Sequence, residues 1–216
     1  MSTPFRRIAC GILSAALGAA AASAAIIRVQ VNGTVDFNVI GGGMAGVPSG
    51  APVTMAFDVD STNVVDSPNF PTRGYPILLS SWAMSVAGVN VPIRDPQPAG
   101  AAYFVLRNND PAVDGFLISS NIEFPVPISV NIPGLAAEHE LDFLRTFNDS
   151  TPLPSLDILD AAGTYGTENL SSFNWTIGRF GNAGAAYNYE SITITPEPVS
   201  FIGLAALGLA CTLRRR

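Results

Sequence analysis

The stretch IRVQVNGTVDFNV, residues 27–39, decides the fold class because apolar side chains fall on every second position. The odd-numbered residues are apolar apart from Gly33, and the even-numbered residues are polar or charged. Successive side chains of a β-strand point to opposite faces of the sheet. The alternation therefore predicts a long strand with one face in a core and the other in solvent. We expect this strand to bend at Gly33, where the apolar face is interrupted.

The same period of two returns along the chain, and clusters of Gly, Pro, Asn and Asp separate its occurrences. The alternating segments that follow are residues 53–59, 82–86, 89–93, 173–177 and 192–194. Further strands are predicted on both sides of the turn at residues 108–111. Residues 122–130 contain two prolines, which favour a sheet edge. Only residues 136–147, with Leu141 and Leu144 at helical spacing, predict a helix.

Short strands separated by turns predict a mainly β fold. We expect a single antiparallel β-sandwich over residues 25–195, of jelly-roll or immunoglobulin-like type. This domain would be flanked by an N-terminal signal helix and a C-terminal transmembrane helix. The two ends of the sequence are the source of that second expectation.

The N-terminus has the three parts of a secretory signal peptide. Arg6 and Arg7 precede an apolar run of small residues, which ends at Ala22-Ser23-Ala24. This A-x-A pattern predicts that signal peptidase removes residues 1–24 after the secretion machinery exports the chain, with Ala22 and Ala24 defining the cleavage site.

The C-terminus has three features in a fixed order. Pro196-Glu197-Pro198 comes first, the apolar run at residues 199–213 follows, and Arg214-Arg215-Arg216 ends the chain. A helix over the apolar run and Pro198 would span roughly 24 Å, less than the ~30 Å hydrocarbon core of a bilayer. It is predicted as a marginal transmembrane segment, with the arginines as a stop cluster on the cytoplasmic side.

These features together resemble the PEP-CTERM protein-sorting domain, and the resemblance covers residues 196–216. The blocks GTVDFNV (33–39) and GAPVTMAFDVDS (50–61) are similar to an uncharacterised β-rich ectodomain type found ahead of such tails. The resemblance implies that an exosortase recognises Pro196, Glu197 and Pro198. It also implies a transient stay in the inner membrane, removal of the tail, and release or attachment at the surface of bacteria that make exopolysaccharide or biofilm matrix.

Charge and cysteine content exclude several classes of function. The chain has 17 Asp and Glu against 11 basic residues, all of them Arg, and every acid lies within residues 25–198. A strongly acidic domain repels polyanions, so nucleic acid is not an expected partner. Cys10 and Cys211 both lie in the apolar ends. No disulfide, thiol nucleophile or thiolate metal site is therefore expected in residues 25–195.

Few residues suggest chemistry. His139 is the sole histidine, so neither a zinc site nor a catalytic triad is predicted, and the interpretation that remains is a surface histidine on a helix. Asp58, Asp60 and Asp66 crowd oxygen ligands at the end of a strand, where a calcium site and a solvated turn are the two interpretations. No other cofactor is predicted.

Five aromatic residues could stack on sugar rings or pack in a core. They are Tyr103, Tyr165, Trp175, Tyr187 and Tyr189. The sequence predicts a protein without catalytic residues that acts structurally or by interaction at the cell surface or in an exopolysaccharide matrix. The alternative is a secreted carbohydrate-active protein, either a glycan-binding module or a glycoside hydrolase with paired carboxylates.

Overall fold

Eight strands follow one another around a ring, and each pairs antiparallel with the strand before it. The computed structural model describes residues 24–109, 113–179 and 182–197. The strands of the ring are β1 (Ile26–Asn38), β2 (Pro52–Asp60), β4 (Thr72–Val86), β6 (Tyr103–Arg107), β7 (Gly115–Ser119), β9 (His139–Phe147), β11 (Leu170–Arg179) and β12 (Asn182–Pro196). Four short strands extend the wall: β3 (Val65–Asp66), β5 (Val89–Asn90), β8 (Ile128–Val130) and β10 (Gly163–Tyr165).

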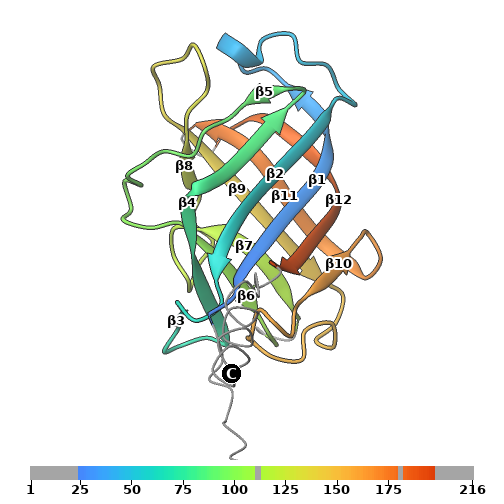
Figure 1. Cartoon of the computed structure of the whole chain (residues 1–216). Helices are drawn as coiled ribbons and strands as arrows, with labels where there is room; N and C mark the ends of the chain where they lie inside the picture. The colour runs from blue at the N-terminus through green and yellow to red at the C-terminus, as the bar shows by residue number, and fades with distance from the viewer. Residues whose placement is uncertain (1–23, 110–112, 180–181, 198–216) are drawn as a thin grey trace, which may run out of the picture.

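The last strand of the ring pairs with the first, which closes the sheet into an antiparallel barrel (Figure 1). The β1–β12 ladder runs from the pair Ile27–Pro196 to the pair Asn38–Ala185. The prediction of a β-sandwich is therefore wrong. The alternation of apolar and polar residues indicates only that each strand has one buried face, and this is equally true of a sandwich and a barrel. The two architectures differ in whether the first and last strands pair, and no local pattern encodes that pairing.

The expected helices are also absent from the part of the chain that the structure describes. The only helix among the described residues is the 3-10 turn η1 (Gly42–Met44). No helix in this part of the chain is long and apolar enough to cross a membrane. The helix predicted at residues 136–147 is strand β9. The predicted signal peptide up to Ser23 and the predicted transmembrane segment at residues 199–213 lie outside the described residues.

The barrel interior is filled by the alternating apolar side chains, as expected for eight strands. Aromatic rings take much of the volume, and Phe104 contacts both Phe57 and Phe116 at ring-centroid distances of 5.7 Å. The largest fully buried apolar side chains are Trp175, Tyr75, Tyr187, Phe57, Phe104, Phe116 and Phe143. A core of this kind stabilises the barrel and leaves its centre occupied by the protein's own side chains.

The β1–β12 ladder has two irregularities, and the second explains where the alternation fails. The first, between Asn32 and Gly33, skips Glu190 on β12 and leaves β1 alternating as far as Val35, whereas the second skips Asp36 on β1 itself. A shift of one residue moves all following side chains to the other face. Phe37 and Val39 therefore leave the interior and are 42% and 78% exposed.

One side of the wall is built in two parts. At one end of the barrel β4 pairs with β6 over residues 72–76. At the other end β4 pairs with β5, and an Ile93–Val130 bridge leads on to β8 and then to β9. The buried side chain of Gln97 fixes the segment after β5 to β8. Its Nε2 donates to Ser129 O at 2.9 Å and its Oε1 accepts from Ser129 N at 2.9 Å.

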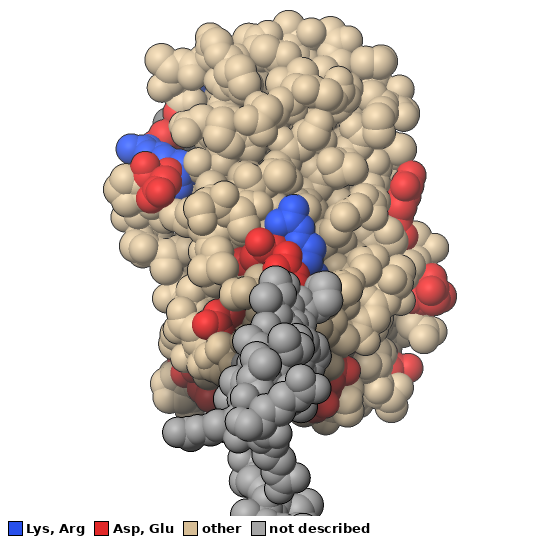
Figure 2. Space-filling model, in the orientation of Figure 1, with Lys and Arg blue, Asp and Glu red and all other residues tan. Residues whose placement is uncertain are grey.

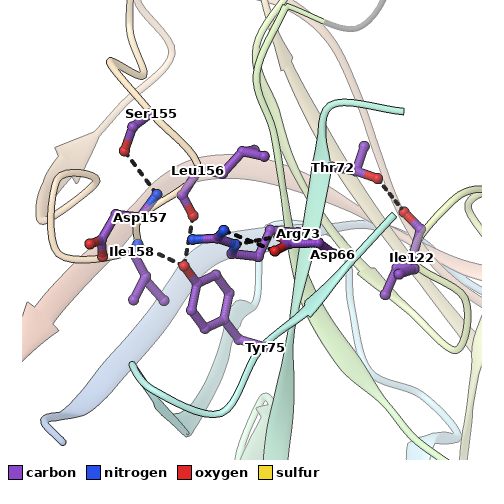
Figure 3. Close-up of polar contacts among 9 residues, drawn as sticks. All are labelled: Asp66, Thr72, Arg73, Tyr75, Ile122, Ser155, Leu156, Asp157 and Ile158. Carbon is purple, nitrogen blue, oxygen red and sulfur yellow. Dashed lines mark hydrogen bonds and ion pairs between the residues drawn. The ribbon is translucent and has the colours of Figure 1, made fainter. Parts of the chain in front are cut away.

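The loop at residues 153–161 covers one end of the barrel and is fixed to it by Tyr75 (Figure 3). The Tyr75 hydroxyl donates to Leu156 O at 2.6 Å and accepts from Ile158 N at 3.0 Å. Burial raises the pKa of Tyr75, which keeps the hydroxyl protonated for the first of these bonds. At the opposite end η1 places Met44 over the core with no exposed surface. Both mouths of the barrel are therefore covered.

The close approach of β12 to β1 at Gly33 generates a test of the barrel seam. A Cβ at this position would lie 2.1 Å from Asn188 O and 2.8 Å from the Trp175 ring. Gly33→Ala should therefore lower the free energy of unfolding in denaturant titrations by about 1–3 kcal/mol. Gly41 has open space around it and a negative φ, so Gly41→Ala should change stability by less than about 0.5 kcal/mol. Equal effects of the two substitutions would contradict the seam geometry.

Candidate functional site

A cleft lies at the rim of the barrel, at the end that η1 covers. Its cavity of ≈ 300 Å³ is bounded by the residues after β1, the start of β9, the end of β11 and Gly184 of β12. Apolar side chains and glycines form most of its wall, and His139 and Arg179 supply the polar groups. The lining residues are Val39, Ile40, Gly41, Leu135, His139, Gly178, Arg179 and Gly184. We call this cavity, together with its neighbour described next, the rim cleft.

A second cavity of ≈ 190 Å³ shares Arg179 with the first. Ser129, Glu138 and Glu140 line the rest of it. Glu140 is paired with Ser129 on β8 and with Gly178 on β11, so these three residues form one row across adjacent strands.

The electrostatics of the rim cleft are balanced. Glu138 forms an ion pair with Arg94, and Glu140 and Arg179 line the same cavity. His139 is 4% exposed, and burial lowers its pKa below the usual value of 6.5, with the positive charge of Arg179 acting in the same direction. His139 Nδ1 lies 3.0 Å from Ala137 O, so Nδ1 carries the proton of the neutral ring and Nε2 is a hydrogen-bond acceptor.

His139 is thus neither on a helix nor at the surface, and that interpretation is wrong. Residues 139, 141, 143, 145 and 147 all point into the barrel. The helical spacing of Leu141 and Leu144 suggested otherwise, but Leu144 lies on the opposite face from Leu141. A period of two was present in this segment, and two polar residues on its buried face concealed it.

The second of those polar residues, Arg145, is a buried cation that the sequence analysis missed. Its guanidinium lies 3.7 Å from the centre of the Phe147 ring, and its Nε donates to the Tyr189 hydroxyl at 3.1 Å. Its Nη2 donates to Gly166 O at 3.1 Å and to Glu168 O at 3.3 Å. Aromatic faces and carbonyl oxygens thus replace a carboxylate partner. We assign Arg145 a structural role, joining the β10–β11 turn to the core.

The three aspartates considered for calcium do not converge in the structure. Asp58 pairs with Arg28 at 2.8 Å, and Asp66 pairs with Arg73 at 2.6 Å (Figure 3). Asp60 accepts from the Thr62 amide and hydroxyl, which lowers the pKa of its carboxyl group. Within the described ranges no three His, Cys, Asp or Glu side chains gather as a metal site would require.

The aromatic residues considered for sugar stacking lie mostly in the core. Trp175, Tyr187 and Tyr189 are at most 4% exposed, while Tyr103 and Tyr165 are half-buried. The Tyr165 ring packs against Phe116 and Phe147, and its hydroxyl donates to Ala161 O at 3.0 Å. Their main role in this structure is therefore packing.

The predicted processing residues that the structure describes, Ala24, Pro196 and Glu197, lie at the end of the barrel opposite the rim cleft. β1 begins two residues after Ala24, and β12 ends at Pro196, the first residue of the sorting motif. Glu197 still belongs to the ladder, because its amide donates to Ile26 O at 2.8 Å. Ala22, Pro198 and Arg214, Arg215 and Arg216 lie outside the described residues.

Comparison with known proteins adds no relative: no family model, no curated protein sequence and no solved structure matches this chain. The functional argument therefore stands on the residues and on the geometry above.

The buried neutral His139 generates a prediction about acid stability. Its pKa is lowered in the folded state, so the unfolded chain binds the proton more readily once the pH falls below about 6.5. The free energy of unfolding should therefore drop as the pH is lowered from 7.5 to 5.5, and it should drop less in His139→Gln, which cannot titrate. Denaturant titrations at both pH values measure the difference. The same drop in the two proteins would show that His139 is not held neutral.

Proposed function

We propose that this chain is an exported protein that an exosortase sorts through its C-terminal tail and that acts without catalysis at the cell surface or in an exopolysaccharide matrix. The sorting motif and the signal-peptide pattern support the route. The barrel supports a role by interaction, because its interior is filled by its own side chains and the rim cleft opens on its surface.

One observation carries the proposal: both predicted processing points meet at the same end of the barrel. Ala25 N donates to the Ser61 hydroxyl at 3.1 Å, and Ser61 N donates to Ala25 O at 3.0 Å. On the neighbouring strand, Pro196 pairs with Ile27. The barrel thus begins just after the predicted signal cleavage and ends within the predicted motif. Removing both segments would leave every strand of the ring in place.

The outer surface is consistent with this setting. Figure 2 shows that the face carrying β1 and β2 is mostly uncharged, with only small groups of acidic and basic side chains. The outward side chains of β1 and β12 include several amides and hydroxyls, such as Gln30, Asn32 and Thr193, beside a few charged residues such as Arg28 and Glu190. Such a surface attracts neither polyanions nor anionic lipid, and it stays soluble through hydrogen bonds to water.

Replacing Pro196, Glu197 and Pro198 together with alanine tests the sorting route. The variant should accumulate as an unprocessed precursor, because the processing enzyme loses its recognition motif while the barrel keeps its ladder. Immunoblotting of cell fractions and mass spectrometry of the C-terminus measure this outcome.

A matched control places alanines at Thr62 and Asn63, two exposed residues in a turn at the same end of the barrel. This control should be processed like the natural protein. A mature C-terminus and a location that stay unchanged when the motif is replaced would refute exosortase sorting.

A further inference from the structure

We infer that the rim cleft binds a neutral, hydroxyl-rich ligand, most simply the end of a saccharide chain. The inference rests on the proposed function for its ligand class, because an exported protein of a polysaccharide matrix meets glycans. The geometry of the cleft supplies the rest of the argument: its size, its apolar wall, its polar groups and its place on the barrel.

The size of the rim cleft fits a small ligand. The cavities of ≈ 300 and ≈ 190 Å³ adjoin at Arg179. Together they match the lower range of ligand sites, which begins at about 300 Å³. A space of this size suits one or two sugar rings. Val39, which is 78% exposed, and Leu135 both line the larger cavity. They form an apolar surface on which the C–H face of a sugar ring can pack.

The lining of the two cavities holds both donors and acceptors, as a polyol ligand needs. Arg179 is a donor at the junction of the cavities, and the carboxylates of Glu138 and Glu140 are acceptors in the smaller one. His139, whose Nδ1 is bonded to Ala137 O, lines the larger cavity. Each sugar hydroxyl donates and accepts one or more hydrogen bonds, and bonds to charged side chains are the stronger ones.

The charges that line the cleft favour a neutral ligand over an acidic one. The carboxylates of Glu138 and Glu140 line the smaller cavity together with the guanidinium of Arg179, and Glu138 is also paired with Arg94, which does not line either cavity. An acidic sugar would therefore meet two carboxylates in the smaller cavity. A neutral polyol makes charge-assisted bonds to both kinds of group without a net electrostatic cost.

The position of the rim cleft also fits a ligand outside the cell. Val39 and Ile40 follow the end of β1, whereas Ile26 and Pro196 mark the end of the barrel that carries the predicted sorting motif. The length of β1 separates the two ends. A barrel held or presented at its motif end therefore directs the cleft away from the point of attachment.

The test uses His139 as a reporter, because it is the sole histidine of the chain and gives a single imidazole signal in NMR spectra. The full, untagged chain is titrated with glucose, galactose, mannose, cellobiose and glucuronic acid. At least one neutral sugar should shift the His139 signal saturably, with glucuronic acid bound about tenfold more weakly or not at all.

Two variants locate the binding site. Glu140→Gln should weaken the neutral sugar about tenfold, because a charged acceptor becomes a neutral one. Val39→Asp should weaken it as well, and because Val39 is mostly in solvent this variant keeps the fold. Asp66→Asn, in an exposed ion pair with Arg73, is the control and should bind like the natural chain.

The inference is overturned if none of the sugars shifts the signal saturably, if only glucuronic acid binds, or if both cleft variants bind normally. Sorting is measured in cells by the mature C-terminus, and ligand binding on the purified chain. Failure of the ligand assignment is therefore distinguishable from failure of the sorting proposal.

Discussion

The pairing of β1 with β12 is the interaction on which the rest of this structure depends. An antiparallel sheet that does not close exposes two edges of unpaired amides and carbonyls, and a barrel removes them. Here the pairing runs along nearly the whole of β1. It encloses the aromatic core, and it brings the two ends of the domain together at the pair Ile27–Pro196. The filled interior and the shared position of the predicted processing points both follow from this ladder.

The sequence predicts the parts of this fold that a local pattern can encode. The buried face of β1 up to Val35 and that of β2 follow directly from alternation. Closure does not, because it depends on how many strands pair and in which register, and residues 27 and 196 meet only after every intervening strand is in place. Phe37 shows the same limit on a smaller scale, since a register shift against β12 moves it to the surface. β9 was missed because His139 and Arg145 occupy its buried face.

The candidate sites differ in the same way. The sorting motif is contiguous and can be recognised from sequence, whereas the rim cleft is assembled from segments as distant as Val39, Ser129 and Arg179. No spacing rule connects those residues. The two features nevertheless lie at opposite ends of one rigid ladder. In the proposed function, the end of the barrel with the sorting motif directs the protein to its location, and the end with the rim cleft binds a ligand at that location.

Disulfide trapping across the seam tests the central claim, barrel closure, most directly. With Cys10 and Cys211 replaced by serine, Gln30→Cys with Thr193→Cys places two thiols on directly paired residues, within the ~4.4–6.8 Å Cα separation that a disulfide needs. Gln30→Cys with Asn174→Cys places them two strands apart, about 10 Å or more. The account predicts rapid, intramolecular oxidation of the first pair in the native protein and none of the second. A first pair that stays reduced under the same oxidant, or two pairs that oxidise alike, would contradict a closed barrel.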